Sequence, residues 1–242
     1  MLEELLMNPL VILVLVGIFI MLIGITMASS AYPRFLQISE KYSDVPHSLE
    51  TISAEVIAWG IKNLHQRTRL VALKSDEQGD FYVPKSDTIC LTNKVYFGKS
   101  ITDLAIASHE FGHSIQKNKN SFGTKICYIL HLINNFLLNI SWPLVFLGFI
   151  IYLIPFDYNL IGKVMIYVGI IGYFVNIMLK IALIPHEHNA STRAIKFLKS
   201  KTNLSKQEIS QIREVLRAAG DTYIASLFYR PYRIIRFIFK GY

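Results

Sequence analysis

Three long apolar runs dominate the pattern of hydrophobic and polar positions along the chain. They cover residues 9–28, 127–154 and 160–184 and are rich in Leu, Ile, Val and Phe. Because a helix needs about 20 predominantly apolar residues to cross a bilayer, each run predicts one transmembrane helix. Residues 155–159 leave room only for a hairpin loop between the second and third runs. Both ends of this hairpin are therefore expected on the same side of the membrane.

Between the first two runs the pattern changes to that of a soluble fold. Residues 52–64 carry apolar side chains at helical spacing, with Ser48 or Thr51 as the expected N-cap. Residues 81–83 and 88–91 predict short strands separated by a proline, as suits the edge of a sheet. This block is expected to fold against itself, the membrane surface or the tail.

The tail combines a helix with a basic, aromatic end. Ser205 and Glu208 match a capping box, which predicts a helix through Ala219 that stops at Gly220. Four cations on one face beyond this helix make a spanning segment costly, so we expect an interfacial helix there, with a buried spanning helix as the alternative. These cations are Arg230, Arg233, Arg236 and Lys240.

Composition and charge support a membrane protein. Of the 242 residues 52% are hydrophobic. Only 17% are charged, against about 25% in soluble domains. No Lys or Arg precedes Arg34, and the span 128–184 contains only Lys163 and Lys180, so the net charge of +8 lies in the polar blocks. The positive-inside rule places these blocks in the cytoplasm, beside the anionic inner leaflet, and the N-terminus outside. With no nucleic-acid motif, this charge does not indicate nucleic-acid binding.

The chemistry is carried by an HExxH sequence. A helix is predicted over residues 100–116, and the spacing of His109 and His113 puts both imidazoles on one face of it. Two histidines so placed are metal ligands, and Glu110 is positioned to act on a water without binding the metal. A pair of surface histidines on an ordinary helix is the simpler alternative.

A catalytic zinc needs a third protein ligand and an open position. The residues after the motif do not match HExxHxxGxxH, which excludes a metzincin. The hairpin returns the chain to the cytoplasmic face just before Glu187, and Pro185 suits the first turn of a new helix. Glu187 is therefore the expected third ligand, although His186 and His188 are possible ligands. Pairing of Glu187 with Arg193 or Lys180 is the alternative.

The chain resembles the YugP-type family of membrane zinc-dependent neutral metallopeptidases over nearly its whole length. The matching segments are the N-terminal anchor, residues 53–56, 91–92 and 108–116, the hairpin, and residues 185–191 and 218–225. The resemblance implies His109, His113 and Glu187 as ligands of one Zn2+ per chain and Glu110 as the catalytic residue, in agreement with the residues taken alone. It also implies a location in the bacterial cytoplasmic (inner) membrane.

Two departures from the family pattern stand out. A segment similar to Asp-His-Tyr-Asp-Pro occurs here as Asp-Phe-Tyr-Val-Pro at residues 80–84, without its His and second Asp. His186 and His188 stand where apolar residues are expected. Any substrate role for the first segment is therefore in doubt, and the two histidines could tune the metal.

Taken together, the sequence predicts a mainly α membrane protein with three transmembrane helices, a cytoplasmic gluzincin-like α+β metalloprotease unit and an interfacial C-terminal helix. The expected parts are an anchor (1–28), a metalloprotease segment with the HExxH helix (29–126), a transmembrane hairpin (127–184) and a segment with the third ligand and the tail helix (185–242).

The expected activity is hydrolysis of peptide bonds by a zinc-activated water, with Glu110 as general base and a membrane-associated peptide or protein as substrate. Extended substrate is expected to pair with an edge strand at residues 88–91, and Tyr223 and His188 are candidates for a donor to the oxyanion. The alternatives are an inactive membrane scaffold or adaptor that retains the metallopeptidase fold, and a prenyl-type protease, which would have more spanning helices.

Overall fold

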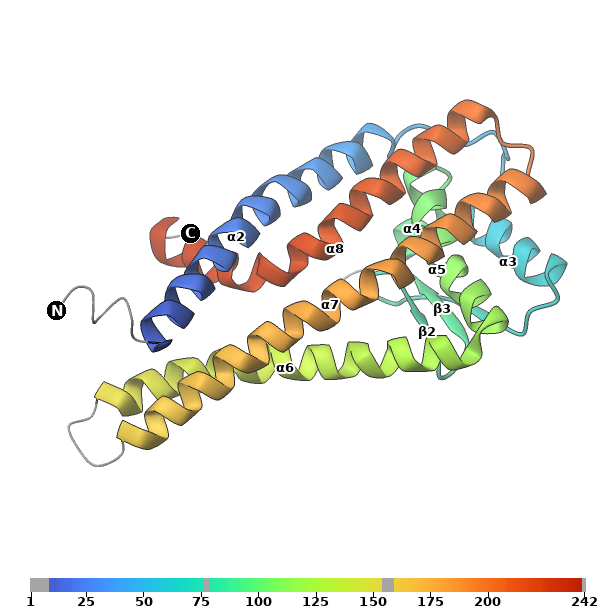
Figure 1. Ribbon diagram of the computed structural model, residues 1–242. Helices are drawn as coiled ribbons and strands as arrows, with labels where there is room; N and C mark the ends of the chain where they lie inside the picture. The colour runs from blue at the N-terminus through green and yellow to red at the C-terminus, as the bar shows by residue number, and fades with distance from the viewer. Residues whose placement is uncertain (1–8, 76–78, 154–158, 241–242) are drawn as a thin grey trace. The chain divides into compact units, whose positions relative to one another are not determined.

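The computed structural model describes residues 9–75, 79–153 and 159–240 (Figure 1). The chain divides into two compact units. The hairpin unit comprises residues 1–30, 129–183 and 224–242, and the HExxH unit comprises residues 31–128 and 184–223. The elements are α2 (Pro9–Lys41), α3 (Ser53–Asn63), β1 (Arg69–Ala72), β2 (Phe81–Val83), β3 (Thr88–Leu91), α4 (Asn93–Phe97), α5 (Ile101–Lys119), α6 (Ser121–Leu153), α7 (Asn159–Lys201) and α8 (Lys206–Lys240).

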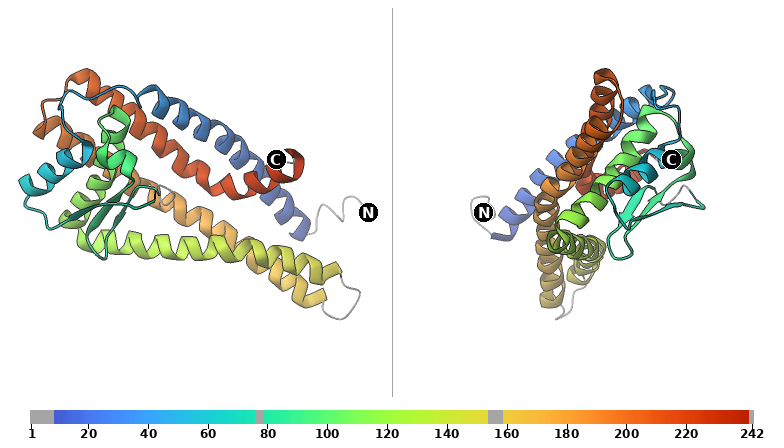
Figure 2. Two further views of the ribbon diagram at one scale, coloured as in Figure 1. Left: turned by 180° about the vertical axis from the view of Figure 1, so that it is seen from behind. Right: turned by 90° about the vertical axis from the view of Figure 1, so that its right-hand side faces the viewer.

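Helix α5 is the centre of the HExxH unit. It contacts α3, α4, β2 and β3, so it is surrounded by the rest of this unit (Figures 1 and 2). A capping box starts it: the Asp103 N–H donates to the Ser100 hydroxyl over 3.1 Å, and the Ser100 N–H donates to the Asp103 carboxylate over 3.2 Å. The core around α5 is apolar and fully buried, and its largest members are Ile57, Ile89, Leu91, Leu104 and Phe111.

The sheet has the strand order β1-β3-β2. Strand β2 runs antiparallel to β3 with Tyr82 opposite Ile89, and β1 runs parallel to β3 with Leu70 opposite the same residue. The prediction that residues 88–91 offer a free edge is wrong, because β1, which the pattern did not predict, covers the second side of β3. The strand with an open side next to α5 is β2.

In the hairpin unit, α6 and α7 are long and apolar enough to cross a membrane, with mean hydropathies of 2.0 and 1.9. Their large apolar side chains point outward, whereas polar side chains lie between them. The Asn176 amide donates to the backbone oxygen of Asn134 over 2.7 Å and to its side-chain oxygen over 2.9 Å. Two of the three predicted spans therefore have the required form.

The third predicted span and the tail remain predictions. Residues 9–28 are helical as the start of α2, but most of their side chains lie outside the described residues. Residues 154–158 of the predicted hairpin loop also lie outside them, as do the side chains of the tail from residue 224 onward. The interfacial placement of the four tail cations is therefore not tested.

Helix α7 does not end before Pro185, contrary to the prediction of a new helix there. It is continuous from Asn159 to Lys201 with Pro185 inside it. Proline has no N–H, so the carbonyl of Ile181 loses its helical partner. Leu183 and Ala190 on either side are both fully buried, and this packing outweighs one missing hydrogen bond.

Two other predicted helix ends are also wrong. Helix α8 continues through Gly220 to Lys240, because Gly220 does not adopt the positive φ that a glycine stop requires. Helix α3 begins after Ile52, which makes no side-chain cap. The Thr51 hydroxyl donates instead to the Glu55 carboxylate within the first turn.

Candidate metal centre

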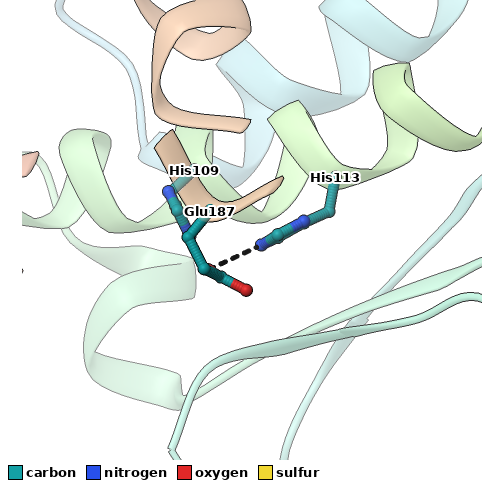
Figure 3. Close-up of side chains that lie close together, drawn as sticks. All are labelled: His109, His113 and Glu187. Carbon is teal, nitrogen blue, oxygen red and sulfur yellow. Dashed lines mark ion pairs between the residues drawn. The ribbon is translucent and has the colours of Figure 1, made fainter. Parts of the chain in front are cut away.

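The HExxH helix α5 and the segment of α7 after the third apolar run bring three candidate ligand groups together. His109 and His113 lie one turn apart on α5, and Glu187 faces them from α7 (Figure 3). The Glu187 Oε2 atom is 3.5 Å from Nε2 of His109 and 3.4 Å from Nε2 of His113. One ligand atom from each residue lies within 4.8 Å of the others. The structure thus unites all three predicted ligands.

The two separations between Glu187 and the histidines fit a zinc ion. Bonds of about 2.05 Å at tetrahedral angles place two ligand atoms about 3.3 Å apart. Both Nε2–Oε2 distances, 3.4 and 3.5 Å, are close to that value. The set of two imidazoles and one carboxylate also matches the ligands of catalytic zinc sites, which leave the fourth position open.

Each histidine is held through its other ring nitrogen. Nδ1 of His109 is 3.0 Å from the Ser191 hydroxyl, and Nδ1 of His113 is 2.9 Å from the amide oxygen of Gln116. Partners of this kind orient metal-binding imidazoles and direct the free Nε2 toward the metal. The sequence pattern gave no role to Ser191 or to Gln116, although Gln116 lies one turn after His113 on the same face of α5.

Close approach of the two helices places Glu187. A Cβ atom added to Gly112 would overlap the backbone carbonyl of Ala190. Gly112 lies on the histidine face of α5, and Ala190 lies one turn after Glu187 on α7. Only glycine lets α7 come this near, so this glycine sets the distance between the two ligand-bearing helices.

Glu110 is buried on the side of α5 that faces the sheet. The pKa of its carboxyl is raised to about 8: burial is the largest cause, the charges of Glu187 and Asp80 add to it, and His113 and the Tyr82 N–H oppose it. A positive charge at the triad would favour the carboxylate. Glu110 thus lies between the ligand set and the open strand β2, as a residue acting on a water would need.

The remaining candidate residues lie at the margin of the site. The His186 ring is 5.5 Å from the His113 ring, and the backbone oxygen of His186 accepts a hydrogen bond from Gln116. His188 is exposed. Burial raises the pKa of Tyr223, and the nearby charge of Glu187 raises it further.

The alternative ion pair with Arg193 is not what the geometry favours. Arg193 donates from Nε to the side-chain oxygen of Asn189 over 2.6 Å. Glu187 instead faces the two histidines of α5. The charge of Glu187 is therefore directed at the candidate metal position.

Comparison with known proteins agrees with this geometry. The family described as "Putative neutral zinc metallopeptidase" matches residues 12–240. The chain belongs to this family. It is also 30% identical over 159 residues to a protein of Bacillus subtilis (strain 168) named "Putative membrane protease YugP", an alignment that covers 66% of this chain and 67% of the relative. No solved structure matches the chain. The resemblance stated from the motifs is confirmed.

Proposed function

We propose that the protein is a membrane-bound zinc metallopeptidase that hydrolyses peptide bonds. The observation that carries this proposal is the meeting of His109, His113 and Glu187 with a buried Glu110 beside them. Membership in a zinc metallopeptidase family supports it. A scaffold role has no comparable observation in its favour.

His109 and His113 would hold one Zn2+ per chain through Nε2, and Glu187 through its carboxylate. Bound zinc lowers the pKa of a water to about 7 and polarises the scissile carbonyl. Glu110 accepts the proton of the attacking water and delivers it to the leaving amine, which completes the cleavage. Its burial excludes bulk water from this transfer.

Extended substrate would pair with β2 rather than with β3. In an antiparallel ladder, the N–H and C=O of one residue point to the same side of the strand. The Tyr82 N–H is directed at Glu110, so the Tyr82 carbonyl faces the same side. A substrate strand added at this open edge would lie beside the general base.

Tyr223 is our candidate for the donor to the oxyanion. Its hydroxyl is buried, and burial and Glu187 both raise its pKa, which keeps the phenol protonated. A protonated phenol near the third ligand can donate to the oxygen that becomes negative in the transition state. The exposed His188 has no such burial.

The protein would act in the bacterial cytoplasmic membrane with its site on the cytoplasmic side and its N-terminus outside. Two apolar helices and a membrane-protease relative support the membrane location. The basic blocks support the orientation, because cations are retained beside the anionic inner leaflet. The expected substrate is a membrane-associated peptide or protein.

The test compares Glu110→Gln with the wild type in detergent. Cleavage of an unbiased peptide library, followed by mass spectrometry, should fall by about 10² to 10⁴-fold, because the general base is lost. Zinc content should stay at one per chain, because Glu110 is not a ligand. The matched control is Glu55→Gln on the exposed face of α3. Undiminished cleavage by Glu110→Gln would reject this mechanism, and zinc binding without cleavage by the wild type would favour a scaffold.

A further inference from the structure

Gln116 makes three contacts that meet at the metal centre. Its amide oxygen is 2.9 Å from Nδ1 of His113. Its amide nitrogen donates to the backbone oxygen of His186 over 2.7 Å and to the side-chain oxygen of Asn189 over 3.1 Å. Gln116 itself is only 5% exposed, and its partner Asn189 lies at the surface of α7.

The His186 contact fixes the direction of the Gln116 amide. A backbone carbonyl can only accept, so the NH2 group must face His186 and the amide oxygen must face His113. That oxygen can also only accept, so Nδ1 of His113 must carry a proton. In a neutral imidazole this leaves the lone pair on Nε2, the nitrogen that faces Glu187.

His109 has no equivalent constraint. Its Nδ1 faces the Ser191 hydroxyl, which can either donate or accept. This contact orients the ring and leaves both tautomers possible. The two ligands of α5 therefore differ: the contacts of Gln116 determine the tautomer of His113, and those of Ser191 leave that of His109 open.

The same amide also joins the two ligand-bearing helices. It reaches from α5 to the carbonyl of His186, the residue directly before Glu187, and to Asn189 in the same turn of α7. Asn189 is held in turn by Arg193. Movement of the Glu187 turn away from α5 would break both bonds of the buried amide, which is costly.

We propose that Gln116 is a positioning residue that prepares the site for metal. It holds His113 in the Nδ1-protonated tautomer and keeps the Glu187 turn against α5 before the ion binds. The proposal rests on the proposed zinc site and adds the residue that sets its affinity. Gln116 touches neither the metal nor the substrate.

The experiment uses Gln116→Met, which keeps the size of the side chain and removes the amide. Zinc affinity of the full-length protein in detergent, measured by competition with a chelating dye, should fall by about 10 to 100-fold. Nitrogen NMR of histidine-labelled, metal-free protein should show His113 as the Nδ1-protonated tautomer in the wild type and as a mixture in the variant. The nitrogen signal reports which ring nitrogen of His113 carries the proton. If Gln116 only stabilised the fold, its replacement would leave this signal unchanged.

Two further variants complete the test. Gln116→Glu retains an acceptor for the Nδ1 proton, so this variant should keep the His113 tautomer of the wild type. It provides the test if Gln116→Met folds poorly. Ser191→Ala removes the partner of His109 and should leave the His113 signal unchanged. Equal zinc affinity of Gln116→Met and wild type, or an unchanged tautomer, would overturn the proposal alone. A wild type that binds no zinc would overturn the proposed function with it.

Discussion

The two units differ in where their large apolar side chains lie. In the HExxH unit the fully buried residues are mostly large and apolar, as Ile57, Leu104 and Phe111 illustrate. In the hairpin unit Asn176 is 0% and Ser141 1% exposed. Large apolar side chains are exposed on the same helices, among them Phe146 at 66% and Leu160 at 70%. In water, burial of apolar side chains is favourable. In lipid, apolar side chains are equally stable on the surface, and polar side chains are favoured between the helices.

Helix α7 contributes to both units. Its sequence therefore changes from mostly apolar to mixed polar and apolar although the helix is continuous. Residues 159–183 belong to the hairpin unit and residues 184–201 to the HExxH unit. Glu187 lies one turn beyond that change on a continuous helix. The candidate third ligand therefore lies on a helix and not on a loop.

The difference between the two units is tested most directly by putting a polar side chain into the HExxH core and an apolar one between α6 and α7. Leu104→Asn buries a polar group in the HExxH core and should lower the free energy of unfolding by about 3 to 5 kcal/mol. Asn176→Leu removes two hydrogen bonds between α6 and α7 and should cost only about 1 kcal/mol, because bonds between membrane helices are worth little individually.

Thermal unfolding of both variants in detergent, followed by circular dichroism, measures the difference. Asn134→Leu is the matched control, because it removes the partner in the same pair. If Leu104→Asn and Asn176→Leu lower the free energy of unfolding equally, the two units do not differ in their tolerance of polar and apolar side chains, which would contradict the contrast between them.

Two glycines of the HExxH unit, one at a close helix contact and one in open space, should respond differently to substitution by alanine. Gly112→Ala puts a methyl group against the Ala190 carbonyl and should lower the free energy of unfolding by about 1 to 3 kcal/mol. Zinc affinity should fall as well, because α7 must move away with Glu187. Gly220→Ala adds its methyl in open space on an exposed turn of α8 and should stabilise by up to about 1 kcal/mol.

Calorimetry and dye competition on the same preparations separate the two effects of these substitutions. Full zinc affinity in Gly112→Ala would mean that the helices adjust without displacing the ligand. A destabilised Gly220→Ala would contradict the finding that α8 is regular there.

Local signals in the sequence predicted the ligands and the start of α5. HExxH specifies two ligands through helical spacing alone, and the capping box at Ser100 is equally local. Glu187 was predicted because the hairpin topology returns the chain to the same side of the membrane, which needs only the lengths of the apolar runs. The structure brings all three candidate ligands together.

The features that were missed depend on tertiary packing. Pro185 and Gly220 normally end helices, but buried neighbours accompany Pro185 inside α7, and α8 continues through Gly220 without the positive φ of a glycine stop. Strand β1 has only four residues with a mixed burial pattern, so its sequence gives a weak signal. The role of Gln116 depends on the His186 carbonyl, whose position no side-chain pattern records.

The smallest predicted effect concerns the start of α8. The Glu208 carboxylate accepts from the Ser48 N–H over 2.6 Å and from the Ser205 N–H over 2.7 Å, as the predicted capping box requires. Burial by itself would raise the pKa of Glu208, but the hydrogen bonds from Ser205 and Ser48 outweigh it and lower this pKa below 4.5.

A carboxyl with a lowered folded-state pKa adds stability above its unfolded pKa, and this stability disappears as the pH falls through the folded value. Glu208→Gln should therefore be less stable than wild type at neutral pH, by about 1 kcal/mol, and the difference should shrink below about pH 4.5. Ser205→Ala removes the hydroxyl, which accepts from the Glu208 N–H over 3.2 Å, but keeps the Ser205 N–H that donates to the Glu208 carboxylate. Part of the pH dependence should therefore survive in this variant. Thermal unfolding of the three proteins across this pH range measures the effect. If the difference in stability between Glu208→Gln and wild type does not change with pH, the charge of Glu208 does not contribute to it.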